Sequence, residues 1–526
     1  MGRNSSHRSG IRKGLELVNS GGSPTGEPSG RDLISKIVAR TMTVLVGNAF
    51  SKAMLVGFEF FLARALGASQ YGAFSICLSL LFVVSNLGLL GLNFGIIQYL
   101  AIYQEQKQED KVLSLVICAL VVIGLAGSLL GTTLFATASL LAERLFRKPE
   151  LAPGLRVLAF IVPLETINQC LSSIFQGLRK FKDHVLVSDL ARNLCLAASI
   201  PFILKWNLSL SQIVEIMMAG STLALVTGLL RLHRSLPSRK VPRPFALDSS
   251  VLRQIASFSY LLFFWNLFQN VAGRFQVLLA GVFLTSEGVG IFSLFLRIVL
   301  VFTFLQTAIT RTAPVEFARL NHLKDHESLR RLFEFIAQSL LIISLLIALP
   351  IFVRPSFWLG LFGKAYSTQP WLLLPLVLGQ VVNVGTGPIG HLLISCGAQS
   401  AVFLAALIAS TTQLVSSCIL MPTLGVAGAV FAETATTLSL VIIRHTLSYK
   451  YFGIHFLNRQ LLALLSIFGL SALSGFLLAL KGTGVASLVR GSAASIAVFA
   501  CLMLAYSYLD KGLASNLAIP RSRSNP

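Results

Sequence analysis

The sequence predicts an all-α polytopic membrane protein with about fourteen transmembrane helices, arranged as two parallel six-helix repeats plus a C-terminal helix pair. Of the 526 residues, 54% are hydrophobic and only 12% are charged, whereas soluble proteins carry about 25% charged residues. Residues 112–142 form one uncharged run, and about 20 apolar residues suffice to cross a bilayer. Similar runs recur along the chain, and solidly apolar stretches such as 340–351 disfavour the alternating pattern of a β-barrel.

Fourteen apolar segments define the helices, because backbone groups in lipid must be paired within a helix. In chain order they are 42–66, 72–100, 112–140, 154–178, 184–205, 209–232, 254–282, 287–311, 331–355, 369–395, 399–421, 425–447, 459–481 and 486–509. The predicted divisions are a disordered cytoplasmic tail (1–35), an N-terminal six-helix lobe (36–232), a cytoplasmic basic linker (233–252), a C-terminal six-helix lobe (253–450), helices 13 and 14 (451–510) and a second cytoplasmic tail (511–526).

Charge and motif content argue against several function classes. The formal net charge of +22 is distributed as expected for contact with an anionic membrane surface rather than nucleic acid. The seven cysteines lie in apolar segments without a CxxC pair, which indicates packing residues and no metal site. The sequence shows no phosphate-binding glycine loop and no nucleophile elbow. We therefore expect no enzyme activity, no catalytic residues, no resident cofactor and no nucleic-acid partner.

The distribution of lysine and arginine predicts the orientation, because short cytoplasmic loops are enriched in these residues. With the N-terminus inside, the cytoplasmic segments hold about 29 of them and the outer loops hold about 8. The largest cluster lies between helices 6 and 7 and comprises Arg231, Arg234, Arg239, Lys240, Arg243 and Arg253. Both termini are therefore expected in the cytoplasm.

Short matches at a nearly constant separation indicate an internal repeat. The sequence YGAFS at 71–75 opens helix 2, and VGIFS at 289–293 opens helix 8. IFQG at 174–177 and ISCG at 394–397 lie near the ends of helices 4 and 10, with almost the same separation. Because helix 1 maps to helix 7, both halves run the same way through the membrane, as parallel repeats do about an axis along the membrane normal.

Polar stripes follow the helical period in four segments, where lipid cannot solvate them. They comprise Asn48, Lys52 and Glu59 in helix 1; Asn266, Asn270 and Arg274 in helix 7; Glu165, Asn168, Gln169, Ser172 and Gln176 in helix 4; and Gln380, Asn383 and His391 in helix 10. We expect all four stripes to face a central cavity between the lobes.

The deepest charges indicate what this cavity would bind. The cations are Lys52, Arg192, Arg274 and Arg297, and the anions are Glu59, Glu165 and Asp189. An excess of cations suits an anionic substrate such as a diphosphate. The substrate-binding candidates are therefore Lys52, Arg274, Arg297, Arg192, Asn266 and Asn270. The alternative is internal pairing, since Asp189 and Arg192 are i, i+3 neighbours that can neutralise each other.

Five short segments carry a family resemblance. They are ARALGASQYG at 63–72, NLGL at 86–89, LFGKAY at 361–366, LGQ at 378–380 with Gly387, and PTLGVAGA at 422–429. Their order and spacing resemble the O-antigen and exopolysaccharide repeat-unit flippases, the polysaccharide branch of the multidrug/oligosaccharidyl-lipid/polysaccharide exporter superfamily. The resemblance covers about residues 35–450. Asn86 departs from the pattern, because an acidic residue is common there in the family.

The resemblance implies a flippase of the bacterial inner membrane that moves polyprenyl-diphosphate-linked oligosaccharide by alternating access. The sugars and diphosphate would enter the cavity while the prenyl tail stays among the membrane lipids. Coupling to H⁺ or Na⁺ is expected, with Glu165, Glu59 and Asp189 as candidate ion-coupling residues. The expected partners are the lipid-linked substrate, membrane lipids, and a polysaccharide polymerase or glycosyltransferases.

Three other functions stay open from the sequence. A cation-coupled multidrug efflux transporter would usually have twelve helices and a more anionic cavity. A flippase for the peptidoglycan lipid precursor also has fourteen helices. A membrane glycosyltransferase or polymerase would typically need a large outer loop, and no loop on the outer side here exceeds about 20 residues.

Overall fold

The computed structural model describes residues 30–206, 208–235, 263, 272–309, 313–453, 459–480 and 485–509. Side chains are described from residue 50 onward, except at 189, 272, 305, 307–309, 315, 459–460 and 507–509. Over these ranges the chain is helical and contains no strand. Eleven of the described helices are long and apolar enough to cross a membrane, or twelve if one bent pair counts as a single span. The predicted all-α polytopic fold is confirmed. Residues 236–252 of the linker predicted at 233–252, and most of both tails, lie outside the described residues.

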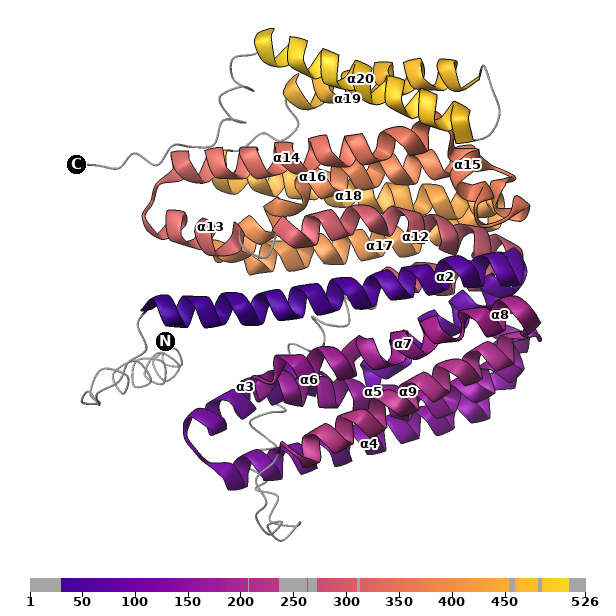
Figure 1. The fold of residues 1–526 in the computed structure, drawn as a ribbon, viewed down its shortest axis with the longest axis vertical. Coiled ribbons are helices and arrows are strands. Elements are labelled where there is room, and N and C mark those ends of the chain that lie inside the picture. The colour runs from indigo at the N-terminus through magenta and orange to yellow at the C-terminus, as the bar shows by residue number, and fades with distance from the viewer. Residues whose placement is uncertain are drawn as a thin grey trace, which may run out of the picture.

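The first bundle, here called the N-terminal lobe, comprises α2 (Gly30–Gly88), α3 (Leu92–Glu105), α4 (Glu109–Leu140), η1 (Leu141–Leu145), α5 (Leu151–Gly177), α6 (Phe181–Val185), η2 (Leu186–Leu190), α7 (Ala191–Ala198), α8 (Ile200–Trp206) and α9 (Leu210–His233). α5 is central, because it packs against α4, α9, α3 and α2. The lobe forms the lower half of Figure 1.

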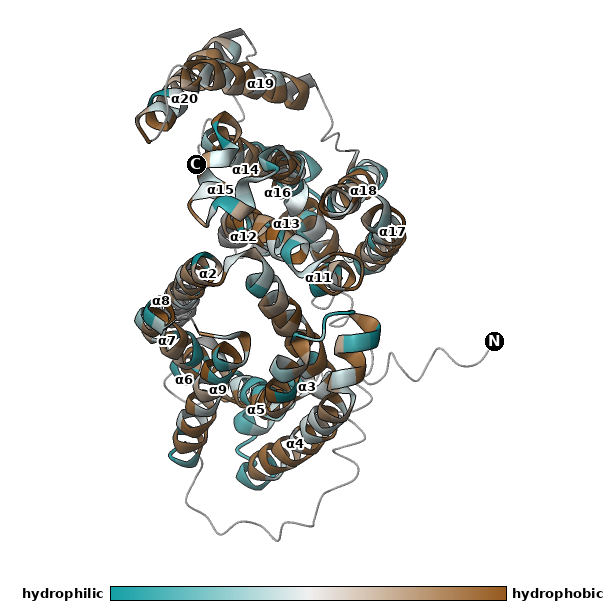
Figure 2. Ribbon diagram, turned by 90° about the vertical axis from the view of Figure 1, so that its right-hand side faces the viewer, coloured by the Kyte–Doolittle hydropathy of each residue, from teal (hydrophilic) through white to brown (hydrophobic). Residues whose placement is uncertain are grey.

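The second bundle, here called the C-terminal lobe, comprises α11 (Ala272–Phe283), α12 (Ser286–Ile309), α13 (Ala313–His322), α14 (His326–Val353), α15 (Pro355–Gly360), η4 (Lys364–Ser367), η5 (Pro370–Leu372), α16 (Leu373–Ser395), α17 (Gln399–Leu424) and α18 (Val426–Phe452). The last pair, α19 (Arg459–Ala479) and α20 (Val485–Leu509), packs on α14 at the outer edge of this lobe, as Figure 1 shows. Hydrophobic residues dominate the helices of both lobes in Figure 2.

The outward faces of the lobes are apolar. Leu125 and Leu129 of α4 are 67% and 70% exposed, and Leu462 of α19 is 66% exposed. So many exposed leucines are unusual for a soluble protein and suit contact with lipid. The protein is therefore a multi-pass membrane protein.

α2 contains two predicted transmembrane segments, which meet at Gly67. Its φ of 69° and ψ of 175° interrupt the helix, and glycine adopts such angles without steric cost. The second segment was predicted to run to residue 100, and that end is wrong. Leu90 and Gly91 have φ values of 50° and 71°, so the helix ends at Gly88 and α3 starts afresh.

The fifth predicted helix, 184–205, is also interrupted. α6 and the π-helical turn η2 precede α7 and α8, and the two parts are bent by 40°. A π-helical turn widens the hydrogen-bond ladder and is a recognised cause of bending. The segment contains Asp189, whose side chain lies outside the described residues, and Arg192, which is described below.

A reciprocal glycine contact joins the lobes and agrees with the predicted repeat. A Cβ atom built on Gly72 of α2 would lie 1.8 Å from the carbonyl oxygen of Ser286 at the start of α12. A Cβ atom built on Gly290 of α12 would lie 1.9 Å from the carbonyl oxygen of Ala68 of α2. The separation from Gly72 to Gly290 along the chain equals that from Ala68 to Ser286. The contact of Gly72 with Ser286 and the contact of Gly290 with Ala68 are therefore equivalent, as expected for two halves related by a two-fold axis.

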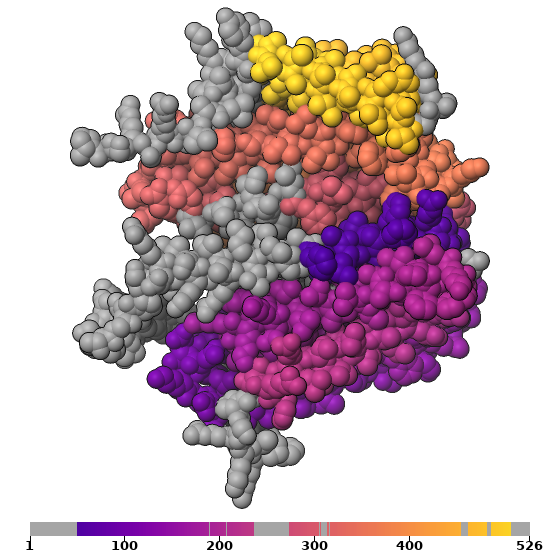
Figure 3. All heavy atoms as spheres, viewed as in Figure 1, coloured from indigo at the N-terminus to yellow at the C-terminus, as the bar shows by residue number. Residues whose placement is uncertain are grey.

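Further contacts between the lobes lie at the same end of the molecule. The Tyr366 hydroxyl donates to the Ala63 carbonyl at 3.0 Å, and the Lys148 ammonium donates to the Gly281 carbonyl. Burial lowers the pKa of Lys148, and the nearby Glu150 offsets part of this effect. In Figure 3 the described part of α2, in indigo, lies between the two lobes. All these residues belong to or flank loops predicted on the outer side, so the lobes are joined at the predicted outer end.

Candidate functional site

A cavity of about 310 Å³ lies between the lobes and is here called the inter-lobe cavity. Helices α2, α11, α12, α16 and α18 line it, and its polar residues are Ser75, Ser79, Arg274, Gln276, Ser293, Arg297, Thr303, Gln380 and Glu433. Two pairs occupy equivalent positions of the repeat, namely Ser75 with Ser293 and Ser79 with Arg297. The positive charge of the cavity therefore comes from the C-terminal half, where an arginine replaces a serine and Arg274 adds a second cation.

Arg297 is paired across the lobes. Its Nε lies 2.8 Å from a carboxylate oxygen of Glu59 in α2, and the two side chains are 22% and 6% exposed. The other Glu59 oxygen, Oε1, is buried without a hydrogen-bond partner among the described residues. The pair ties α2 to α12 at the wall of the inter-lobe cavity and gives Arg297 a counter-ion.

Arg274 is the second cation of the inter-lobe cavity. Its guanidinium lies 5.2 Å from the ring centroid of Phe82 in α2, a distance typical of a cation–π contact. Within the described part of the chain, Arg274 forms no ion pair with a carboxylate. An aromatic face stabilises a guanidinium without occupying its N–H donors, so these stay available to an anion.

Two other predicted ligand sets have different surroundings. Lys52 is exposed on α2 with its ammonium 5.5 Å from the ring of Phe304 in α12, so it faces the second lobe. Asn266 and Asn270 lie outside the described residues, and their roles stay predictions.

The polar stripe of α5 contacts neighbouring helices of its own lobe. Glu165 accepts from Arg192 of α7 at 2.8 Å, with side-chain exposures of 11% and 18%. The Asn168 amide donates to the Ser221 carbonyl of α9 at 2.9 Å. Both side chains therefore have partners within the N-terminal lobe, and their facing toward the cavity between the lobes stays a prediction. A substrate-binding role for Arg192 stays a prediction, since Glu165 compensates its charge here.

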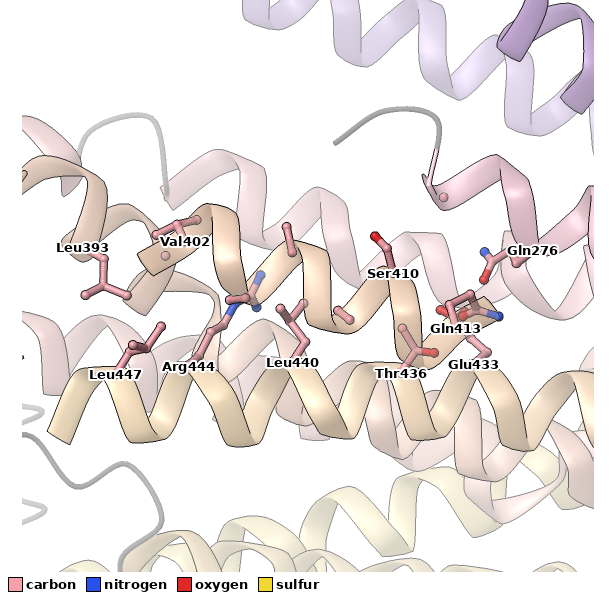
Figure 4. Close-up of a pocket in the computed structure, with 15 residues that line it drawn as sticks. Gln276, Leu393, Val402, Ser410, Gln413, Glu433, Thr436, Leu440, Arg444 and Leu447 are labelled. Atoms are coloured by element: carbon pink, nitrogen blue, oxygen red, sulfur yellow. The ribbon is translucent and has the colours of Figure 1, made fainter. Parts of the chain in front are cut away.

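A second cavity of about 220 Å³, here called the C-lobe chamber, lies within the C-terminal lobe between α11, α16, α17 and α18. Figure 4 shows its polar residues, among them Gln276, Ser410, Gln413, Glu433, Thr436 and Arg444. Sequence reasoning overlooked Glu433 and Arg444, although both are charges inside the predicted segment 425–447. Gly273, Gln276 and Glu433 line both cavities, so the two spaces adjoin.

Comparison with known proteins agrees with this architecture. The family described as "Polysaccharide biosynthesis protein" matches residues 37–315. A provisionally named O-antigen transporter of Shigella flexneri is 25% identical over 358 residues, which cover 65% of this chain and 80% of that protein.

Solved structures share the fold. The lipid II flippase MurJ, in an inward closed conformation, aligns with a TM-score of 0.68 at 14% identity over 89% of this chain and 99% of MurJ. An inward-facing multidrug resistance transporter of the MATE family aligns with a TM-score of 0.60 at 15% identity, over 76% of this chain and 94% of that chain. At such identities the likeness shows the fold alone. Because the family match spans more than half of the sequence, the chain belongs to the polysaccharide biosynthesis protein family.

Proposed function

We propose that this protein is a flippase that moves polyprenyl-diphosphate-linked oligosaccharide repeat units across the inner membrane by alternating access. Family membership and the O-antigen relative support this function. The observation on which it chiefly rests is the inter-lobe cavity, in which Arg274 has no carboxylate partner among the described residues. A cation in a membrane-embedded cavity attracts an anionic headgroup that lipid alone cannot stabilise.

The geometry corresponds to one state of such a cycle. The lobes contact each other through Gly72, Gly290, Lys148 and Tyr366, at the end that the charge distribution places outside. In that orientation both termini are cytoplasmic and the inter-lobe cavity would admit substrate from the cytoplasm. The diphosphate would bind Arg274 while the prenyl chain remains in lipid, and separation of the outer contacts would release the substrate outside. A polymerase or glycosyltransferases would be the functional partners.

Ion coupling is the second part of the proposal. H⁺ or Na⁺ would bind a carboxylate that changes access with the lobes. Glu433 suits this role, because it lines both cavities and makes no ion pair or hydrogen bond within the described ranges. Glu59 retains one unpartnered oxygen, whereas Glu165 is held by Arg192.

Arg274→Ala is expected to lower the rate of flipping about 10–100-fold, because a hydrogen bond to a charged group contributes about 1.5–3 kcal/mol. The measurement is translocation of a fluorescent polyprenyl-diphosphate trisaccharide in proteoliposomes, read by quenching of the label that reaches the outer leaflet. Arg156→Ala is the control, since Arg156 is exposed and bonds only to Ser139 among the described residues. Equal rates for the two variants would remove Arg274 from the site. Absence of flipping by the unaltered protein would reject the proposed function.

Glu433→Gln is expected to abolish stimulation of flipping by a proton or sodium gradient, while substrate exchange without a gradient continues. The amide keeps the size of the side chain and removes its negative charge. Glu215→Gln is the matched control, because Glu215 occupies the equivalent position in the first repeat and is exposed. Gradient-driven flipping at the normal rate in Glu433→Gln would show that another group carries the ion.

A flippase for the peptidoglycan lipid precursor is the second candidate, favoured by the likeness to MurJ along almost its whole length. Both substrates share a polyprenyl diphosphate, so the glycan discriminates between them. Complementation of a strain depleted of its own lipid II flippase would support the second candidate. Restoration of surface polysaccharide in a repeat-unit flippase mutant would support the first.

A further inference from the structure

We propose that the C-lobe chamber binds an acidic sugar of the transported glycan, with Arg444 holding the sugar carboxylate. This inference rests on the proposed function and adds a substrate class to it. Four features of the chamber support it. Among the described residues, Arg444 has free donors and lacks a counter-ion. The chemistry of the walls and the connection to the inter-lobe cavity are the other two features.

Within the described part of the chain, most donors of Arg444 have no partner. One nitrogen, Nη1, donates to the Asn383 side-chain oxygen of α16 at 2.8 Å. A guanidinium carries five N–H donors, and the described residues accept from Arg444 nowhere else. Figure 4 shows Arg444 extending from α18 into the space beside α17. The remaining donors therefore point to a ligand or to water in the C-lobe chamber.

The charge of Arg444 has no counter-ion among the described residues. The one carboxylate that lines the same chamber is Glu433, eleven residues away on the same helix. At about 1.5 Å per residue, eleven residues separate the two groups by roughly 16 Å along the axis. The N-terminal lobe provides the contrast, because its half-buried Arg192 is paired with Glu165 at 2.8 Å. An arginine within a membrane-spanning helix is costly without a counter-ion, and an anionic ligand would remove that cost.

The chamber suits a carboxylate-bearing sugar in both chemistry and size. A guanidinium fork matches a carboxylate with two parallel hydrogen bonds. The amides of Gln276 and Gln413 and the hydroxyls of Ser410 and Thr436 offer donors and acceptors to sugar hydroxyls. The volume of about 220 Å³ is below the roughly 300–1,000 Å³ of sites that enclose a whole drug-sized ligand. The chamber therefore fits one part of a larger substrate.

The connection to the inter-lobe cavity assigns Arg444 to the glycan rather than to the diphosphate. Gln380 lines the inter-lobe cavity, and its oxygen accepts from Asn383 at 3.3 Å. Asn383 in turn accepts from Arg444. With the diphosphate on Arg274, a sugar attached to it would reach the C-lobe chamber past Gln276, which lines both spaces.

The test compares two probes on the full-length protein in lipid nanodiscs. Both are polyprenyl-diphosphate disaccharides, ending in glucuronic acid in one case and in glucose in the other. The unaltered protein is expected to bind the acidic probe at least about tenfold more tightly, equivalent to about 1.4 kcal/mol. Arg444→Gln should abolish this preference without changing the affinity for the neutral probe. Arg444→Lys, which keeps the charge but lacks the fork, should retain part of the preference. Arg490→Gln removes an exposed arginine of α20 and should leave both affinities unchanged.

Each other outcome overturns the proposal in a recognisable way. Equal affinity of the unaltered protein for the two probes would show that the chamber does not select an acidic sugar. Equal weakening of both probes by Arg444→Gln would assign Arg444 to the diphosphate or to packing. Failure of the unaltered protein to bind either probe would reject the proposed function, and the assignment of Arg444 with it.

Discussion

Gly72→Ala is expected to abolish transport while both lobes remain folded. The added methyl group would lie 1.8 Å from the Ser286 carbonyl oxygen and 2.7 Å from the Gly290 nitrogen, both of them backbone atoms. Overpacking of this kind costs about 1–3 kcal/mol, and each 1.4 kcal/mol changes a population ratio about tenfold. The contact joins the two lobes, so the lobes would separate at the outer end and the protein would favour the opposite state of the cycle.

Thiol accessibility measures this change. A cysteine at Ser75, which lines the inter-lobe cavity, would react faster with an impermeant reagent added outside intact cells, in a background whose seven native cysteines are replaced. Gly57→Ala is the matched control, because Gly57 also lies in α2 and a Cβ there meets nothing within 4 Å. Unchanged labelling and transport in Gly72→Ala would show that the contact between the lobes accommodates the methyl group. The contact would then not determine which side of the inter-lobe cavity is open.

Arg297→Ala is expected to produce the second large effect, a loss of stability. The substitution leaves the Glu59 carboxylate, 6% exposed and already short of a partner at Oε1, without its cation. Removing one member of a buried pair costs about 3–5 kcal/mol. We expect a lower thermal denaturation midpoint and a lower yield of the purified protein.

The double variant Glu59→Gln/Arg297→Gln separates the pair from the single charges. It removes both charges together, so its denaturation midpoint should lie above that of either single variant. A double variant as unstable as the sum of the single variants would show that the two groups do not stabilise each other. Arg319→Ala is a suitable reference, because Arg319 bonds Glu316 at an exposed site, where ion pairs contribute little.

The transmembrane helices were readable from the sequence, because an uncharged apolar run has few alternatives to a spanning helix. The repeat could also be predicted from the sequence. The matching segments 71–75 and 289–293 contain Gly72 and Gly290, where the two halves contact each other. Helix ends were less predictable. Leu90 and Gly91 lie in an apolar stretch, and nothing in their hydrophobicity indicates the positive φ values that end the helix.

The facing of polar residues depends on tertiary packing. The helical period places Glu165 and Asn168 on one face of α5, but it does not show which helices pack against that face. In the structure these are α7, which carries Arg192, and α9, which carries Ser221. The partner of Glu165 is 27 residues away, beyond the reach of an i, i+3 argument. Glu433 and Arg444 are charges within the apolar segment 425–447, so the sequence alone identifies them as candidate site residues.

The reciprocal contact between Gly72 and Gly290 bears on the origin of the chain. When two identical polypeptides form a symmetric dimer, a contact from residue i of one copy to residue j of the other is repeated from j to i. The same reciprocity holds here, because Gly72 meets Ser286 and Gly290 meets Ala68. The geometry is the one expected if the two halves arose from a homodimer whose subunits became joined end to end. Ser79 and Arg297 occupy equivalent positions of the two halves, so a single chain can carry a charge in one half where the other half is neutral.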